Sequence, residues 1–258
     1  DILDNIDRKA VTERMMKLLE IRNREQQTVQ ILPEHTAQIK QYLKALRDYK
    51  AGEHKVVLVS MDNTTSAPAQ RNEHLTTMPD SVDIICLMNP DNLHPTLAGE
   101  FAKVREKGTR VIYNIDYNAI EKLWEKVLAD EEANKPEEPT NPSTPEATQD
   151  EGGEGGGEGE PTPEEELELR FLEFCRQQTV SQLNLCAKYG YDGVQVNYTG
   201  RAPQAMQEEE KAQYAARQEA FFSNVKTWNE ANSGKVLVFQ GNPQNLIDKS
   251  VLGECDYI

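Results

Sequence analysis

The chain has 258 residues, of which 37% are hydrophobic, and it carries a formal net charge of −16 at pH 7. This length suits a single α/β barrel domain, whereas the acidic balance argues against a nucleic-acid partner. The sequence has no apolar run of about 18 residues or more, so no membrane-spanning helix is predicted.

The first part of the chain, residues 1–52, predicts a helical N-terminal lead-in made of two helices. Apolar residues recur at helical spacing over residues 6–22 and again over residues 34–50. Pro33 stands just ahead of the second pattern, where proline is favoured. Gly52 follows that pattern and is typical of a helix end.

Residues 53–258 alternate strand-like runs with helical patterns, which predicts an α/β fold with a parallel sheet. The strand-like runs are Val56–Met61, Val82–Met88, Thr109–Ile115, Tyr191–Tyr198, Lys235–Phe239 and the beginning of a sixth at Cys255–Ile258. The helical patterns cover Pro95–Lys107, Pro163–Tyr189 and Gln207–Asn232. Because the strands are almost continuously apolar, we expect the sheet to be buried on both faces.

A low-complexity segment of Glu, Gly, Pro and Thr covers residues 132–163 and interrupts the third βα connection. This composition cannot form a core, so we predict that the segment is disordered. It holds much of the negative charge, because residues 131–166 contain 13 acids and one Lys. We interpret it as a tolerated surface insertion rather than a functional lid.

The four cysteines and four histidines show no spacing typical of a metal site. Cys86 and Cys255 lie in apolar runs, where a free cysteine acts as a small hydrophobic residue. Cys175 and Cys186 lie three turns apart on a predicted helix, too far apart to bridge each other. We therefore expect no disulfide framework, no metal and no cofactor.

The run from Tyr191 to Gly200 is the most informative stretch, because polar and apolar residues alternate in it after an Asp-Gly pair. A strand has a period of two, so Gln195, Asn197 and Thr199 share one face. Three inward polar side chains in so apolar a strand need partners. We expect them to line a cavity or the mouth of a barrel.

The spacing resembles the fourth-strand signature of glycoside hydrolase family 18, the chitinases and endo-β-N-acetylglucosaminidases, written D-G-x-D-x-D-x-E. Asp192 and Gly193 match its beginning, and the three later carboxylate positions fall on Gln195, Asn197 and Thr199. In the family, the final Glu protonates the glycosidic oxygen and the Asp before it orients the substrate's N-acetyl group. Thr199 and Asn197 can do neither, because one has no acidic proton and the other carries no charge.

Residues 42–50 and 78–85 also resemble a subgroup of this family that is encoded in bacterial polysaccharide-utilisation gene clusters. The resemblance extends over about residues 40–258, excluding the acidic insert. It implies a (β/α)8 TIM barrel over residues 53–258, of which about six strands are present. Since strands seven and eight would follow Ile258 and the chain starts at Asp1 rather than Met, we expect a fragment truncated at both ends.

The candidate ligand-binding residues stand at the carboxyl ends of the strands, where the sites of such barrels lie. They are Asp62, Asn89, Asp116, Tyr117, Gln195, Asn197, Tyr198, Thr199 and Gln240. Amides and hydroxyls suit sugar hydroxyl groups, and we expect Tyr117 and Tyr198 to stack on a sugar ring. The alternative for each residue is that loops simply favour Asn, Asp and Gly. Asp192 is interpreted as structural, capping the Asp-Gly turn.

The resemblance implies a catalytically inactive family 18-like protein that binds N-acetylglucosamine-containing glycans, with an oligosaccharide or N-glycan as ligand. Two alternatives stay open. One is an active glycosidase with a relocated acid, either Asp116 or Asp62, and the other is a scaffold without a sugar site in an uptake complex. The resemblance further implies export to the bacterial outer-membrane surface or periplasm, with outer-membrane glycan-uptake proteins as partners.

Overall fold

The computed structural model describes residues 8–63, 66–135 and 161–258. Its centre is one sheet of five parallel strands, in the spatial order β1-β2-β3-β4-β5. The strands are β1 (Leu58–Met61), β2 (Ile84–Leu87), β3 (Arg110–Asp116), β4 (Gly193–Tyr198) and β5 (Val236–Gly241). Neighbours in sequence are neighbours in space, as in a (β/α)8 barrel, so the expected fold class is confirmed as part of such a barrel.

The expected sixth strand is represented among the described residues by one isolated bridge. Tyr257 forms an isolated parallel bridge with Val238. The carbonyl of Tyr257 accepts from the backbone N–H of Phe239 at 2.9 Å. The C-terminal residues therefore continue the sheet in the same direction and on the far side of β5.

Three helices connect the strands at or next to the predicted bounds, namely α2 (Pro95–Glu106), α4 (Pro163–Tyr189) and α5 (Glu208–Ala231). The ends of α4 follow from local sequence. Thr162 and Glu165 form a capping box at its start. Gly190 ends it in the left-handed conformation, with φ 72°. Short 3₁₀ turns cover Arg71–Glu73, Leu75–Thr77, Pro203–Ala205, Pro243–Asn245 and Ser250–Glu254.

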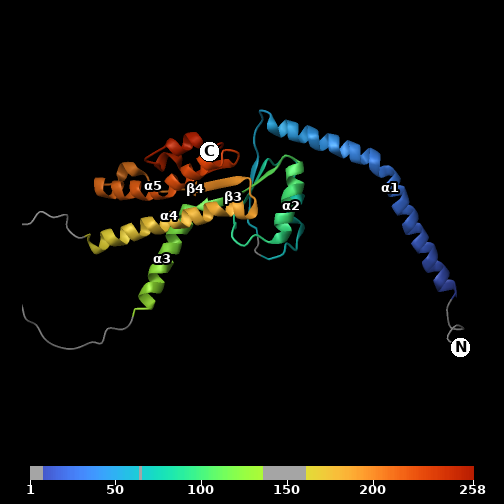
Figure 1. The fold of residues 1–258 in the computed structure, drawn as a ribbon, viewed down its shortest axis with the longest axis horizontal. Helices are drawn as coiled ribbons and strands as arrows, with labels where there is room; N and C mark the ends of the chain where they lie inside the picture. Colours follow the sequence, from blue (N-terminus) through green and yellow to red (C-terminus); the bar gives the residue numbers. More distant parts are fainter. Residues whose placement is uncertain (1–7, 64–65, 136–160) are drawn as a thin grey trace, which may run out of the picture.

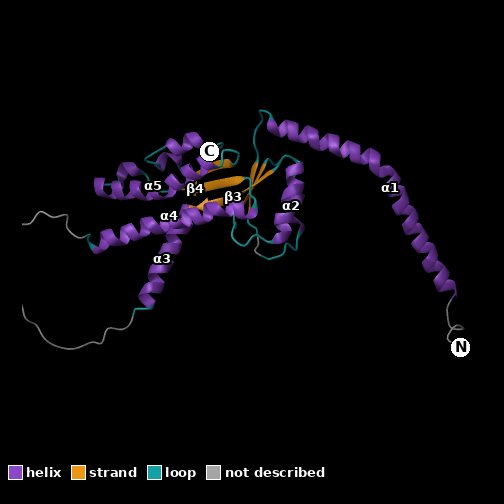
Figure 2. Cartoon of the chain, in the orientation of Figure 1, coloured by secondary structure: helices purple, strands orange, loops and turns teal. Residues whose placement is uncertain are grey.

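The helices cover one face of the sheet, and α4 and α5 run side by side along it (Figure 2). On that face the larger core cluster packs strand residues such as Val194 against helix residues such as Phe221. The opposite face carries a smaller cluster to which, among the described residues, no helix contributes. We call it the helix-free face, and its buried members are Ile84, Cys86, Ile112, Val236 and Val238.

A helix that the sequence did not predict, α3 (Tyr117–Ala133), follows β3 directly. Asp116 caps it, because its side chain accepts from the N–H of Asn118 at 3.0 Å. Tyr117 and Ile120 are buried along its inner side. Part of the predicted disordered insert is therefore helical, since α3 runs to Ala133 and α4 begins at Pro163. The remainder, residues 136–160, lies outside the described residues.

The two predicted N-terminal helices are wrong, because α1 (Arg8–Ala51) is a single helix of 44 residues. No glycine or proline separates residue 22 from Pro33, so nothing in the sequence stops the first helical pattern. A proline inside a helix removes one backbone hydrogen bond and bends the helix without always ending it. Figure 1 shows that α1 bends along its course.

The C-terminal end of α1 is attached to the amino ends of the strands. The Lys50 ammonium donates to the carbonyl of Val82 at 2.7 Å and to the hydroxyl of Thr109 at 2.9 Å. Arg47 donates to the carbonyl of Glu106, also at 2.7 Å. These bonds place the helix at the edge of the sheet opposite to the one where barrel sites lie.

His54 lies in the turn between α1 and β1, and both of its ring nitrogens face hydrogen-bond acceptors. Nδ1 is 2.9 Å from the carbonyl oxygen of Gly52, and Nε2 is 2.8 Å from the carboxylate of Asp83. Both bonds raise the pKa of His54 above its ordinary 6.5, and the bond to the carbonyl of Gly52 has the larger effect. Because His54 has a higher pKa in the folded chain than in the unfolded chain, its protonation stabilises the fold at pH values below the ordinary pKa. This stabilisation is lost as the pH rises through the pKa of the folded state.

We therefore expect the melting temperature of the chain to fall between about pH 5.5 and about pH 8.5 by more than that of a His54→Gln variant. Thermal melts of both proteins across this range measure the difference. Equal pH dependence in the two proteins would show that His54 does not anchor the turn.

Candidate functional site

The register between β3 and β4 decides where each polar side chain of the motif strand lies. Asp192 is structural, as expected, but it joins two strands rather than capping its own turn. Its carboxylate accepts from the backbone N–H of Val111 at 2.8 Å and from Nε of Arg105 at 3.1 Å. Gly193 follows, and a Cβ there would come within 2.1 Å of the carbonyl oxygen of Val236. Only glycine permits this approach of β4 to β5.

A chain of three amides crosses the helix-free face near the carboxyl ends of the strands. Nε2 of Gln195 donates to Oδ1 of Asn114 at 2.9 Å and to Oε1 of Gln240 at 2.7 Å. Gln195 is 2% exposed and Asn114 is 8% exposed. The structure thus supplies the partners that an inward Gln195 needs. Sequence reasoning missed Asn114. Ile112, Asn114 and Asp116 are each two residues apart in β3, so the strand period places them on one face, and this spacing is a usable signal.

The next row toward the carboxyl edge is formed by Asp116, Asn197 and Gln240, which are register partners on neighbouring strands. Thr199 follows Asn197, and its hydroxyl accepts from the side-chain amide of Asn118 at 3.0 Å. The resemblance assigns the family's acid position to Thr199, and a neighbouring helix holds its hydroxyl in place. At this edge the strands carry amides, a hydroxyl and one carboxylate.

Asp62 and Asn89 meet at the ends of β1 and β2. The amide of Asn89 donates to the carboxylate of Asp62 at 2.7 Å. Asn63 is buried and exchanges two further bonds with the backbone of Asn89, at 2.8 and 2.9 Å. These contacts tie two loops together, which is the local structural role that loop-favouring residues often have.

The expectation that Tyr117 and Tyr198 stack on a sugar is wrong. Tyr198 is 1% exposed and Tyr117 is 4% exposed, and their ring centroids lie 5.0 Å apart within the larger core. The reason is the strand period itself, because Tyr198 points to the side opposite to Asn197. The rings support the site from behind and present no face to a ligand.

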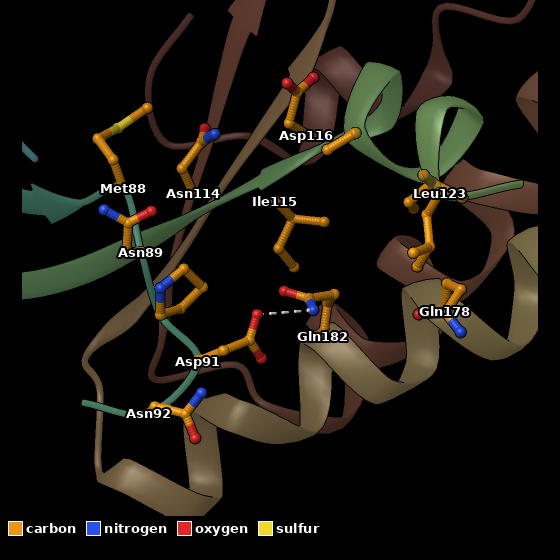
Figure 3. A pocket seen from close by; sticks show the side chains of 13 residues that line it. Met88, Asn89, Asp91, Asn92, Asn114, Ile115, Asp116, Leu123, Gln178 and Gln182 are labelled. Atoms are coloured by element: carbon orange, nitrogen blue, oxygen red, sulfur yellow. Dashed lines mark hydrogen bonds between the residues drawn. The ribbon is translucent and has the colours of Figure 1, made fainter. Parts of the chain in front are cut away.

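The larger cavity at this edge, about 510 Å³, lies over the ends of β2 and β3 and between α3 and α4. Figure 3 shows its polar side chains arranged around Ile115, with Asp91 and Gln182 joined by a hydrogen bond of 3.3 Å. Of the predicted residues, only Asn89 and Asp116 line it. The polar residues around it are Asn89, Asp91, Asn92, Asn114, Asp116, Gln178 and Gln182.

A smaller cavity of about 240 Å³ lies beside the first, between α3, the loop after β4, and α5. It collects Thr199 and the edges of Tyr117 and Tyr198, together with the carboxyl group of Glu121. Burial raises the pKa of Glu121, and the Arg217 guanidinium lies 3.8 Å from that carboxyl. Sequence reasoning missed Glu121 because it missed the helix α3 that carries it. Eight of the nine predicted residues are thus divided among the amide chain, two loops and two cavities, and Asn197 lies in the row between Asp116 and Gln240.

No group of three or more His, Cys, Asp or Glu within the described ranges is placed to hold a metal ion. The described helices include none that is long and apolar enough to cross a membrane. What the site offers chemically is neutral hydrogen bonding, with Asp91 and Asp116 as the carboxylates of the larger cavity.

Residues 23–150 and 164–258 match the protein family described as "Glycoside hydrolase family 18, BT1044-like". Among solved structures, a selenomethionine form of BT1044 resembles the chain with 16% identity and a TM-score of 0.49, over 85% of this chain and 61% of that one. The glycoside hydrolase domain of PelA from Pseudomonas aeruginosa resembles it with 14% identity and a TM-score of 0.33, over 73% and 60%. The chain therefore spans about three fifths of the length of either structure. No curated protein sequence matches it.

The amide chain predicts the effect of a Gln195→Leu substitution. Leucine removes the donor shared by Asn114 and Gln240, and an unsatisfied buried acceptor costs about 1–3 kcal/mol. We expect the free energy of unfolding in urea to fall by about that amount. An exposed amide on α4 provides the control, since Gln177→Leu should change it by less than about 0.5 kcal/mol. Equal effects of the two substitutions would contradict a buried hydrogen bond between Gln195 and Asn114.

Proposed function

The chain belongs to the BT1044-like group of glycoside hydrolase family 18, and from this premise we propose that it binds N-acetylglucosamine-containing glycans without cleaving them. The observation that carries the proposal is the motif strand. Asp192 and Gly193 are kept, whereas Gln195, Asn197 and Thr199 replace the three carboxylates. General-acid catalysis contributes about 10²–10⁴-fold to rate, so a site without its acid retains recognition and loses hydrolysis.

The amide chain supports binding over catalysis. Gln195 gives both protons of its amide nitrogen to Asn114 and Gln240, so its orientation is fixed. An amide fixed in this way neither gains nor loses a proton near neutral pH. Asn114, the member of the amide chain that lines the larger cavity, keeps amide protons for donation. Such a neutral surface suits hydroxyl and acetamido groups.

The larger cavity supports an uncharged ligand. Its volume, about 510 Å³, falls in the usual range for a small-molecule site. Of the residues that line it, Asp91 and Asp116 are acidic and none is basic. A carboxylate or sulfate on a sugar would face like charge without a compensating cation. We therefore propose neutral acetamido sugars in preference to uronic acids or sulfated glycans.

A binding measurement tests the proposal directly. Calorimetric titration of the chain with chitooligosaccharides should give a saturable heat, and Gln178→Ala should weaken the affinity about five- to tenfold. The estimate follows from the loss of one hydrogen bond of about 1 kcal/mol or slightly more. The adjacent Gln177→Ala is the matched control, because Gln177 lies outside the cavity and bonds Glu173 on its own helix.

Two outcomes would count against it. The absence of heat with every chitooligosaccharide and N-glycan tested would remove glycan binding. Equal weakening by the two glutamine substitutions would place the ligand outside the larger cavity.

The second candidate is a glycosidase with a relocated acid, which one observation favours. Burial raises the pKa of Glu121, as a proton donor requires, and its cavity includes Thr199, which stands at the family's acid position. Asp116 and Asp62 are the other candidates at this edge, and both already accept hydrogen bonds from nearby amides.

Hydrolysis distinguishes the two functions. We expect no sugar release from a chitooligosaccharide or N-glycopeptide above the buffer rate, when products are followed by chromatography. Release that is lost on Glu121→Gln, Asp116→Asn or Asp62→Asn would instead establish the glycosidase and identify its acid. Release that all three variants retain would point to a contaminating enzyme.

A scaffold without a sugar site is the least supported candidate, because the cavity at the site edge is open and lined by amides. Export to the bacterial outer-membrane surface or periplasm stays a prediction from the family, as does partnership with glycan-uptake proteins.

A further inference from the structure

The first half of α1 exposes an unusual number of apolar side chains. Five of them, each between 52% and 64% exposed, are Met15, Met16, Leu18, Leu19 and Ile21. A helix of 44 residues is about 66 Å long at 1.5 Å per residue. The contacts described above attach it to the sheet through Arg47 and Lys50, at its C-terminal end. An apolar helix surface of this size is normally covered by a partner.

The same stretch is basic in an acidic chain. Residues 8–24 contain six Lys or Arg against two Glu, whereas the whole chain carries a net charge of −16. Arg14 and Lys17 are exposed beside the apolar residues. The partner should therefore combine negative charge with apolar side chains.

Such a surface exists at the other end of the molecule, where α3 ends and α4 begins. We call it the acidic end, and its exposed acids are Asp130, Glu131, Glu132, Glu164, Glu165 and Glu166. Arg170 joins the two helices there through an ion pair of 2.6 Å with Glu131. Leu167 and Leu169 lie on the same turns of α4 and are 38% and 59% exposed. The acidic end thus combines the negative charge and the apolar side chains that a partner of the first half of α1 needs.

The two surfaces lie at opposite ends of the long axis, so they do not meet within one chain (Figure 1). We propose that the first half of α1 docks on the acidic end of a second copy of this chain. The contact is heterologous, because two different surfaces meet, and it builds head-to-tail oligomers rather than a closed two-fold dimer. An anionic membrane is the less favoured occupant, because it attracts the basic helix but repels the remainder of this acidic chain.

The test is the mass of the chain in solution, measured by analytical ultracentrifugation at about 25 mM and about 500 mM NaCl. At low salt the weight-average mass should rise with protein concentration to at least twice that of one chain. At high salt it should return to one chain as the charges are screened. A single-chain mass at every concentration and both salt levels would overturn the proposal.

Substitutions locate the contact. Leu18→Glu with Leu19→Glu should abolish association, whereas Gln38→Glu, an exposed position nearer the attached end of α1, should leave it unchanged. Arg14→Glu with Lys17→Glu should abolish it, and so should Glu164→Lys with Glu166→Lys. Equimolar mixing of these two charge-reversed proteins should restore association, because each α1 then meets an end of opposite charge on the other protein. One protein carrying all four reversals should associate again for the same reason.

Circular dichroism of each variant separates lost association from lost helix. Association that survives the leucine substitutions with helix content intact would overturn the proposal. So would a single-chain protein that co-sediments with phosphatidylserine vesicles, since that result would assign the surface to a membrane.

Discussion

The carboxylate of Asp192 fixes the register on which the site depends. It accepts from the backbone N–H of Val111 in β3 while Arg105 of α2 holds it from the side. A slip of one residue between β3 and β4 would turn every motif side chain to the opposite face. Gln195 would then enter the helix-packed core, and Val194 would replace it on the helix-free face. The Asp-Gly pair is therefore an element of strand alignment.

Much of the fold was predictable from sequence because its signals are local. The glycines after the helices and the capping residues of α4 place the connecting helices within a residue of their observed bounds. Helix α3 was missed because Asp116 and Tyr117 were interpreted only as a strand end. The break in α1 was predicted from two separate helical patterns with Pro33 ahead of the second, although no glycine or proline lies in the ten residues before Pro33.

The candidate site was less predictable, because its members are joined across strands and layers. Alternation correctly placed Gln195 and Asn197 on one face, and the same alternation should have excluded Tyr198 from that face. Asn114 gains its role from Gln195, which lies 81 residues further along the chain. Glu121 and Gln182 reach the cavities only through the packing of α3 and α4, which no sequence period reports.

The two ends of the strands have different roles in this protein. The amino ends of the strands hold α1, and the carboxyl ends carry the amides and cavities from which we infer sugar binding. Crystallography of the chain with N,N′-diacetylchitobiose tests this central claim most directly. The account predicts an intact disaccharide in the cavity lined by Asn89, Asn114 and Gln178. A cleaved sugar there, or an intact one bound only elsewhere, would contradict it.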